Sequence, residues 1–193
     1  YRAYGQSDAP LAANNPPNLR NETSYGSKRI QAVKVGQLAL FVQRAGRKIH
    51  EYTYEFQRDG FVAPDLTLLA EHLTVGGFTV LGYQQQPDTI LWAVRADGVL
   101  CGLTYLRDQD VVAWTRQITG PDQDLTDGLI ESVAVIPHPD LDRDQVWVGV
   151  KRTINGATKR FVEYFDDKNG YYGATAARIT DAGGLMVDCA GLY

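Results

Sequence analysis

Apolar and polar residues alternate along most of the chain with a period of two, which is typical of β-strands that bury one face. A unit of strand, turn and strand recurs over residues 37–56, 89–106 and 145–165. Its turn glycines, Gly46, Gly98 and Gly156, lie 52 and 58 residues apart. Repeated hairpins with a period near 50 residues are typical of propeller blades and related β arrays. The pattern therefore predicts an all-β fold.

Turn residues separate the two strands of each hairpin. Gly46 lies in the first turn, and the dipeptides Asp97–Gly98 and Asn155–Gly156 lie in the other two. Such dipeptides are favoured in two-residue hairpin loops, because both central residues of these loops need a positive φ. We expect all five residues to be structural turn positions.

Large aromatic side chains occupy the predicted strands. Phe41, Trp92 and Trp147 lie in the first strand of each hairpin, and Trp114 lies in a further strand. At alternating positions within apolar strands, such rings pack in the core between neighbouring sheets. We therefore expect these four to be core residues. A second interpretation, that the tryptophans stack on sugar rings, stays open.

The most complete unit spans residues 78–119, where polar turns join four short strands. Four antiparallel strands joined by tight turns form one propeller-type blade. We expect about three such four-stranded units within a propeller-like domain at residues 25–167. Residues 1–24, rich in Ala, Asn and Pro, are expected to be an extended lead-in. Residues 168–193 are expected to start another region or to complete a blade.

One short helix is expected near residues 65–73, inserted between two sheet units. Asp65 is placed to cap its N-terminus, and Gly76 and Gly77 end it. Apolar residues recur between these points at helical spacing, at Leu66, Leu69, Ala70 and Leu73. We expect this apolar stripe to pack against a sheet.

The 193 residues carry a net charge of −4. An acidic chain argues against a nucleic-acid reader, which normally has a basic face. The basic cluster at Arg44, Arg47 and Lys48 is interpreted as the solvated face of a sheet. Cys101 and Cys189 are too few for a disulfide framework, although one bridge between them stays open. No apolar run reaches the roughly 18 residues of a membrane span.

Candidate catalytic and metal-binding residues lack a recognisable spacing. His50, His72 and His138 show no zinc-type pattern, and motifs for a nucleophile or a phosphate loop are missing from the sequence. Glu131 and Asp88 are the candidate carboxylates of a glycosidase, but nothing in the sequence pairs them. Two groups of aspartates are interpreted as polar turn residues rather than calcium ligands: Asp122, Asp124 and Asp127, and Asp140, Asp142 and Asp144. We expect no enzymatic activity and no cofactor.

Two stretches, PDLTLLAEH at 64–72 and RTINGAT at 152–158, are the most specific marks of a similarity that extends in order over about residues 24–167. These stretches resemble the tail nozzle proteins of short-tailed bacteriophages and prophages, also called tail tubular protein B. The resemblance implies a structural virion component with no catalytic residues. It also implies a hexameric ring at the end of the tail, built around a propeller-like platform, through which DNA is ejected.

The resemblance implies a location in the virion tail, after synthesis in the bacterial host cytoplasm. The implied partners are other copies of the chain, other tail proteins, and DNA that passes without specific binding. Because the chain opens at Tyr1 rather than Met, we expect it to be an internal fragment. Two other functions stay open, a glycan-binding or glycan-active β-propeller and a non-viral β-propeller that serves as an interaction scaffold.

Overall fold

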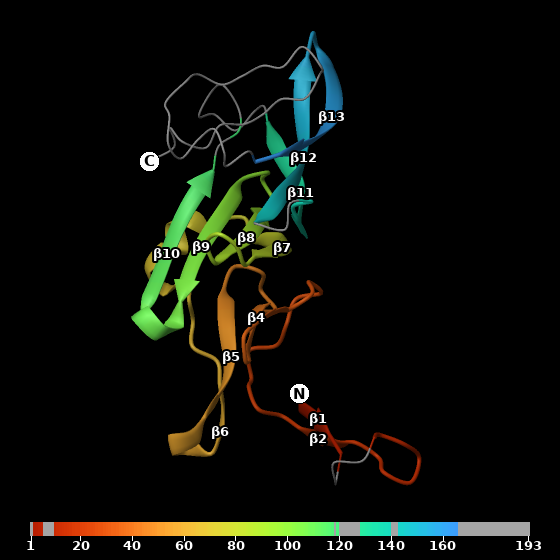
Figure 1. The fold of residues 1–193 in the computed structure, drawn as a ribbon, viewed down its shortest axis with the longest axis vertical. Helices are drawn as coiled ribbons and strands as arrows, with labels where there is room; N and C mark the ends of the chain where they lie inside the picture. Colours follow the sequence, from red (N-terminus) through yellow and green to blue (C-terminus); the bar gives the residue numbers. More distant parts are fainter. Residues whose placement is uncertain (1, 6–9, 118, 120–127, 140–142, 166–193) are drawn as a thin grey trace. The chain divides into compact units, whose positions relative to one another are not determined.

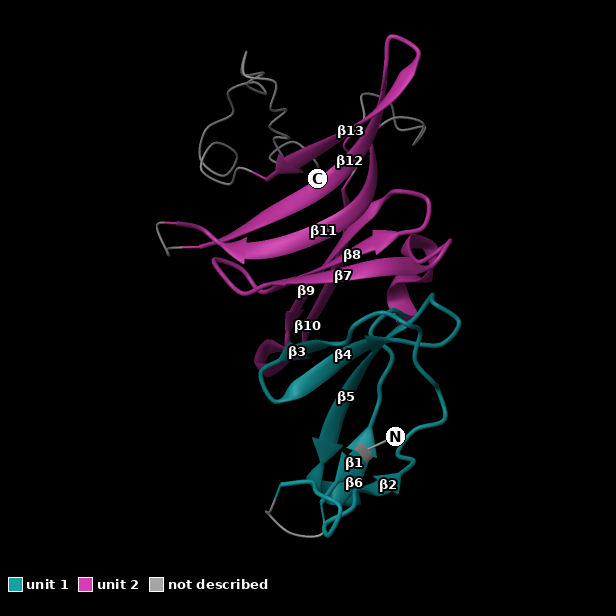
Figure 2. Cartoon of the chain, turned by 90° about the vertical axis from the view of Figure 1, so that its right-hand side faces the viewer, with its two compact units in different colours: residues 1–67 teal, residues 68–193 magenta. Residues whose placement is uncertain are grey.

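The computed structural model describes residues 2–5, 10–117, 119, 128–139 and 143–165. Figure 1 shows that strands dominate these ranges, and each sheet that they form is antiparallel. The expectation of an all-β, antiparallel fold is therefore confirmed. The chain divides into two compact units, residues 1–67 and residues 68–193 (Figure 2).

The first unit contains a four-stranded meander in the order β3-β4-β5-β6. Its strands are β3 (Val33–Val35), β4 (Leu38–Val42), β5 (Ile49–Glu55) and β6 (Gly60–Val62). A short 3-10 turn, η1 (Phe56–Arg58), joins β5 to β6. A separate two-stranded sheet pairs β1 (Arg2–Tyr4) with β2 (Asn18–Arg20). Each strand of the meander thus pairs with the next one in the chain.

Alternation of side chains gives this meander one strongly apolar face. Leu38, Leu40 and Val42 of β4 are buried together with Ile49 of β5. The opposite face carries aromatic rings, since Phe41 lies across from His50 in the register of β4 and β5. The period of two in the sequence thus separates an aliphatic face from an aromatic face.

The second unit contains two sheets, each again a meander. The four-stranded sheet has the order β10-β9-β8-β7, and the three-stranded sheet has the order β11-β12-β13. The strands are β7 (Phe78–Gln84), β8 (Ile90–Arg95), β9 (Leu100–Leu106), β10 (Val111–Gln117), β11 (Leu129–Pro137), β12 (Asp144–Ile154) and β13 (Ala157–Tyr164). Two 3-10 turns, η2 (Leu68–Leu73) and η3 (Arg107–Gln109), lie at its connections.

The core of the second unit lies between its two sheets. Trp92, Val94 and Leu100 of the four-stranded sheet pack against apolar residues of the three-stranded sheet. Those residues are Ile130, Val133, Val146, Val148 and Val150. β7 approaches β11 closely at Gly82, where an added Cβ would meet the Val133 side chain at 3.3 Å. Burial of these aliphatic side chains holds the two sheets face to face.

The hairpin turns follow the prediction in part. Asn155 and Gly156 have φ values of 52° and 75°, as a two-residue loop requires. The turn at Gly98 is different, because Arg95 N donates to Val99 O and Gly98 N donates to Arg95 O. These bonds define a three-residue loop in which Gly98 alone has a positive φ, of 86°. The predicted positive φ at Asp97 is therefore wrong.

The predicted helix near residues 65–73 is a 3-10 segment, η2, broken at Ala70 (φ −122°, ψ 25°). Leu66 N donates to Ile49 O, and Asp65 bridges to His50. These contacts hold residues 65 and 66 extended along β5, so Asp65 does not begin a helix. The predicted apolar stripe is wrong at Leu69, which is 94% exposed, whereas Ala70 is buried.

The three predicted sheet units correspond to two four-stranded meanders and one three-stranded meander in the described part of the chain. These meanders do not by themselves show a closed propeller or an arrangement of blades around an axis. Cys189 and most of the acidic-loop residues lie outside the described residues. The tail at residues 168–193 lies outside them as well.

Candidate functional site

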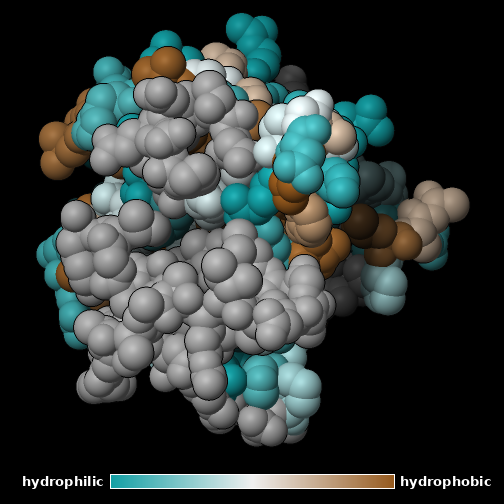
Figure 3. Space-filling model, turned by 90° about the horizontal axis from the view of Figure 1, so that it is seen from above, coloured by the Kyte–Doolittle hydropathy of each residue, from teal (hydrophilic) through white to brown (hydrophobic). Residues whose placement is uncertain are grey.

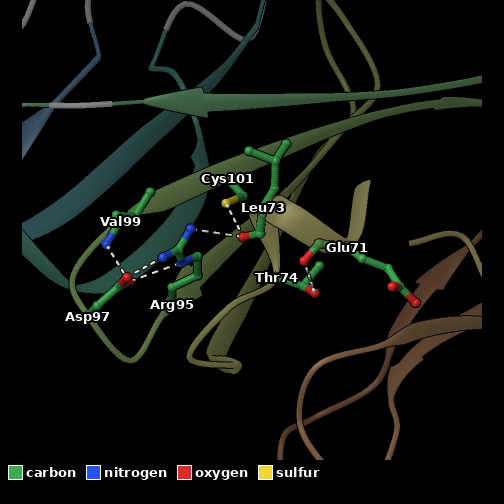
Figure 4. Close-up of polar contacts among 7 residues, drawn as sticks. All are labelled: Glu71, Leu73, Thr74, Arg95, Asp97, Val99 and Cys101. Carbon is green, nitrogen blue, oxygen red and sulfur yellow. Dashed lines mark hydrogen bonds and ion pairs between the residues drawn. The ribbon is translucent and has the colours of Figure 1, made fainter. Parts of the chain in front are cut away.

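Arg95, at the end of β8, is the centre of a polar cluster in the second unit (Figure 4). Its side chain is buried, and it donates from Nε and Nη2 to the carboxylate of Asp97. Nη1 donates to the backbone oxygen of Leu73 at 3.0 Å. The guanidinium therefore joins the β8–β9 turn to the C-terminal end of η2. A bidentate arginine–carboxylate pair fixes orientation as well as distance.

The Leu73 carbonyl oxygen also accepts a contact from Cys101 Sγ at 3.8 Å. Burial raises the pKa of the Cys101 thiol to about 11, and the nearby Arg95 only partly offsets this effect. The thiol therefore stays protonated at neutral pH. Because the thiolate is the reactive form of cysteine, Cys101 has little reactivity in the folded protein. Cys101 is a buried packing residue that also donates weakly to η2.

The segment that follows η2 is held by its own hydrogen bonds. Thr74 is buried, and both its backbone N and its Oγ1 donate to Glu71 O, at 3.2 and 3.1 Å. Ala96 N of the β8–β9 turn donates to Gly77 O at 2.9 Å. Arg95 and Ala96 thus attach this segment to the β8–β9 hairpin at Leu73 and Gly77.

This anchored segment exposes apolar side chains. Leu68, Leu69 and Val75 are 65%, 94% and 53% exposed. On the face of the protein shown in Figure 3, described hydrophobic side chains lie in small groups among hydrophilic ones. Neighbouring exposed apolar residues are a feature of protein–protein interaction sites. We name Leu68, Leu69 and Val75 the apolar turn.

The predicted core aromatics differ in their surroundings. Trp92 is buried, donates from Nε1 to Gln84 Oε1 at 2.9 Å, and stacks on Phe165 at 5.6 Å. Trp114 is half-buried beside Phe78, and Phe41 is half-buried beside His50. The prediction of a core position is therefore confirmed for Trp92, whereas these two rings lie at the edge of the core.

Trp147 lies on the face of β12 that points away from the core, since Val146 and Val148 on either side of it are buried. It is half-buried, donates to Gln145 Oε1 at 3.1 Å, and lies 5.1 Å from the ring of Tyr164. The prediction that Trp147 packs in the core between sheets is therefore wrong.

Asp65 acts as a cap of a local turn rather than of a helix. Its carboxylate accepts hydrogen bonds from Thr67 N and Thr67 Oγ1 and pairs with Lys48 at 2.8 Å. Partial burial alone would raise the pKa of Asp65, but the bonds from Lys48 and Thr67 outweigh it and lower the pKa below its ordinary value. Asp65, the predicted helix cap, thus joins Lys48 and Thr67 within the first unit.

The structure shows no contact between the two candidate carboxylates of a glycosidase, Glu131 and Asp88, both of which are described residues. Glu131 forms a two-point ion pair with Arg160 on the surface, and Asp88 is exposed. Asp144 Oδ2 accepts from Gln85 N and Gln86 N, at 2.7 and 3.1 Å. Within the described ranges, no group of three His, Cys, Asp or Glu residues is placed to hold a metal ion.

His50 has no neighbouring motif in the sequence that would make it a metal ligand. The structure places it in an aromatic layer of the first unit. Its ring is 3% exposed, and Nδ1 lies 2.9 Å from Ala63 O. Because a carbonyl oxygen only accepts, Nδ1 carries the proton in this contact. Nε2 has no partner. Only the tertiary pairing of β5 with residues 63–65 could have indicated this position.

The chain matches no protein-family model and no curated protein. In the described residues, no helix is long and apolar enough to cross a membrane. The assignment of a function therefore rests on the sequence pattern and on the arrangement of the sheets.

Proposed function

We propose that this chain is a structural part of a phage tail, within a nozzle protein that forms part of the conduit for DNA ejection. The observation that carries the proposal is the succession of meanders along the chain. Two of them pack face to face through Trp92 and its neighbours. Consecutive meanders stacked through apolar faces are the building principle of β-propellers. The resemblance at residues 64–72 and 152–158 supplies the specific assignment.

The apolar turn supports a role in assembly. Its three side chains are more than half exposed, and the adjoining backbone at residues 71–74 is held by Arg95 and Thr74. A fixed apolar projection loses little conformational entropy when a partner covers it. In the proposed nozzle, the partner is a neighbouring copy in the hexameric ring or another tail protein.

Mass spectrometry of purified virions tests the proposal directly. Peptides of this chain should copurify with tails, and a Leu69→Asp variant should enter tails less efficiently while keeping its unfolding midpoint. Val112→Asp, which places the same charge on another exposed apolar residue of the second unit, is the matched control. Virions that lack the protein, or a host gene far from phage structural genes, would contradict the proposal.

The glycan-binding alternative no longer includes Trp92 and is tested at Trp147. Trp92 is enclosed between two sheets and cannot stack on a sugar, whereas Trp147 keeps part of its indole at the surface beside Tyr164. A glycan array with wild-type protein and Trp147→Ala separates the two functions. Saturable binding that disappears in the variant, with an unchanged circular dichroism spectrum, would favour the glycan-binding function.

A further inference from the structure

Three rings form a continuous stack in the first unit. Tyr25 lies on His50 with ring centroids 4.3 Å apart and planes 21° apart, and His50 lies on Phe41 at 5.6 Å and 23°. His50 is buried, but Tyr25 is 42% exposed. Among the described rings, Tyr25 contacts His50 alone, so its other face is not stacked on a further described ring. The stack therefore ends in a partly exposed tyrosine.

The position of Tyr25 is fixed by the backbone that follows it. Lys28 N donates to Val42 O at 2.9 Å, and Ser27 bridges to Gln43. Gly26, at φ 67°, lies so close to the β4–β5 turn that an added Cβ would be 3.2 Å from Arg44 Cβ. A ring held in this way needs little reorganisation to accept a ligand.

Basic side chains lie in the β4–β5 turn, and Arg44 of this turn is close to Gly26, the residue that follows Tyr25. Arg44 and Arg47 are exposed in the β4–β5 turn, and neither forms an ion pair with a described residue. Residues 1–67 carry nine Lys and Arg against six Asp and Glu, a net charge of +3, although the whole chain is at −4. Residues 1–67 are therefore basic although the whole chain is acidic, and the charge of this unit is compatible with the binding of nucleic acid.

We infer that Tyr25, Arg44 and Arg47 form a binding site for single-stranded nucleic acid. A base stacks on the other face of Tyr25 as the fourth ring of the stack, and the adjoining phosphates pair with the two arginines. Aromatic rings beside cationic side chains are the usual elements of such sites. An unpaired base is required, because the bases of a duplex are already stacked on one another. This inference does not depend on the proposed role in a phage tail.

Fluorescence anisotropy with a labelled oligothymidylate tests the site in the whole chain. We expect saturable binding that weakens about sevenfold between about 50 and about 200 mM salt, as neutralisation of two phosphates predicts. Tyr25→Ala should weaken binding about tenfold, the loss expected for one stacked base, and Tyr25→Phe should retain it. The double variant Arg44→Ala, Arg47→Ala should remove most of the salt dependence.

Matched controls use residues of the same unit outside the site. Tyr54→Ala removes another exposed tyrosine, 46% exposed, and Arg58→Ala removes an arginine that pairs with Glu55; both should bind as wild type does. Circular dichroism confirms that each variant is folded. The inference is overturned if no saturable binding occurs at the lower salt concentration or if Tyr25→Ala binds as tightly as wild type. Equal affinity for the matching duplex would also overturn it, since phosphates alone would then explain binding.

Discussion

Arg152 of β12 and Glu163 of β13 form two hydrogen bonds of 2.9 Å with each other, and both side chains are buried. Arg152 also donates from Nη1 to Thr119 O at 3.1 Å. The pair therefore fixes the hairpin and the backbone at Thr119 together. A buried ion pair contributes little net free energy, but the loss of one partner leaves an unpaired buried charge.

Glu163→Ala should lower the free energy of unfolding by about 3–5 kcal/mol, because it leaves the Arg152 guanidinium buried without its partner. The double variant Arg152→Met, Glu163→Leu should lose much less, since no charge stays buried. Urea unfolding measures both. Glu131→Ala breaks the exposed pair with Arg160 and serves as the control, for which we expect little change. Equal losses for the single and the double variant would contradict this account.

Gly98 and Gly156 illustrate two different reasons why a turn position requires glycine. Both have a positive φ, of 86° and 75°. An added Cβ has open space at Gly156, but at Gly98 it would lie 2.7 Å from Leu129 Cβ. Gly156→Ala should therefore cost about 1 kcal/mol from backbone strain alone. Gly98→Ala should cost about 2 kcal/mol or more, because a steric clash is added. Thermal unfolding of both variants decides this, and equal losses would contradict the role of Leu129.

The sequence was sufficient to predict the strands, because their alternation reflects directly which face is buried. The Asn155–Gly156 turn was predicted for the same local reason, since only a few residue types accept a positive φ. The Asp97–Gly98 dipeptide predicts a two-residue loop, but the Asp97 carboxylate accepts hydrogen bonds from Arg95 and Val99 N. That arrangement favours a three-residue loop.

To predict whether a tryptophan is buried, one must know which face of its strand points to the core. In β12, Val146, Val148 and Val150 share one face, so Trp147 is out of phase with them. The alternation of these valines is present in the sequence. It is difficult to recognise there, because apolar residues occupy both faces of the strand. In β8, by contrast, residues of both faces are buried, so Trp92 is enclosed whichever way it points.

Contacts between distant residues could not be predicted. The stack of Tyr25 on His50 joins residues 25 positions apart, and the pairing of Leu66 with Ile49 replaced the predicted helix. Helical spacing of leucines is a local signal, and a tertiary hydrogen bond overrides it. For the same reason, the division of the chain after residue 67 has no counterpart in the sequence pattern.

Asp65→Asn should destabilise the first unit at neutral pH by about 1 kcal/mol, since it removes the charged partner of Lys48. The loss is limited because solvent screens a partly exposed pair. The native pKa of Asp65 is lowered, so its contribution is present above the ordinary aspartate pKa of about 4. It disappears as the pH falls through the lower, native value. Chemical unfolding at several pH values should show the two proteins converging in acid, and a constant difference would contradict the ionic role.

Cys101 should resist thiol reagents in the native protein. Burial raises the pKa of its thiol to about 11, so the thiolate fraction at pH 8 is far below that of a free cysteine. In a Cys189→Ser background, labelling with a thiol-specific dye should be slow in buffer and fast in denaturant. The raised pKa also predicts that stability falls as the pH rises from about 8.5 through 11, because the native state holds its proton more tightly than the unfolded chain. Cys101→Ala should lack this alkaline loss, and rapid native labelling would show that the segment held by Arg95 opens readily.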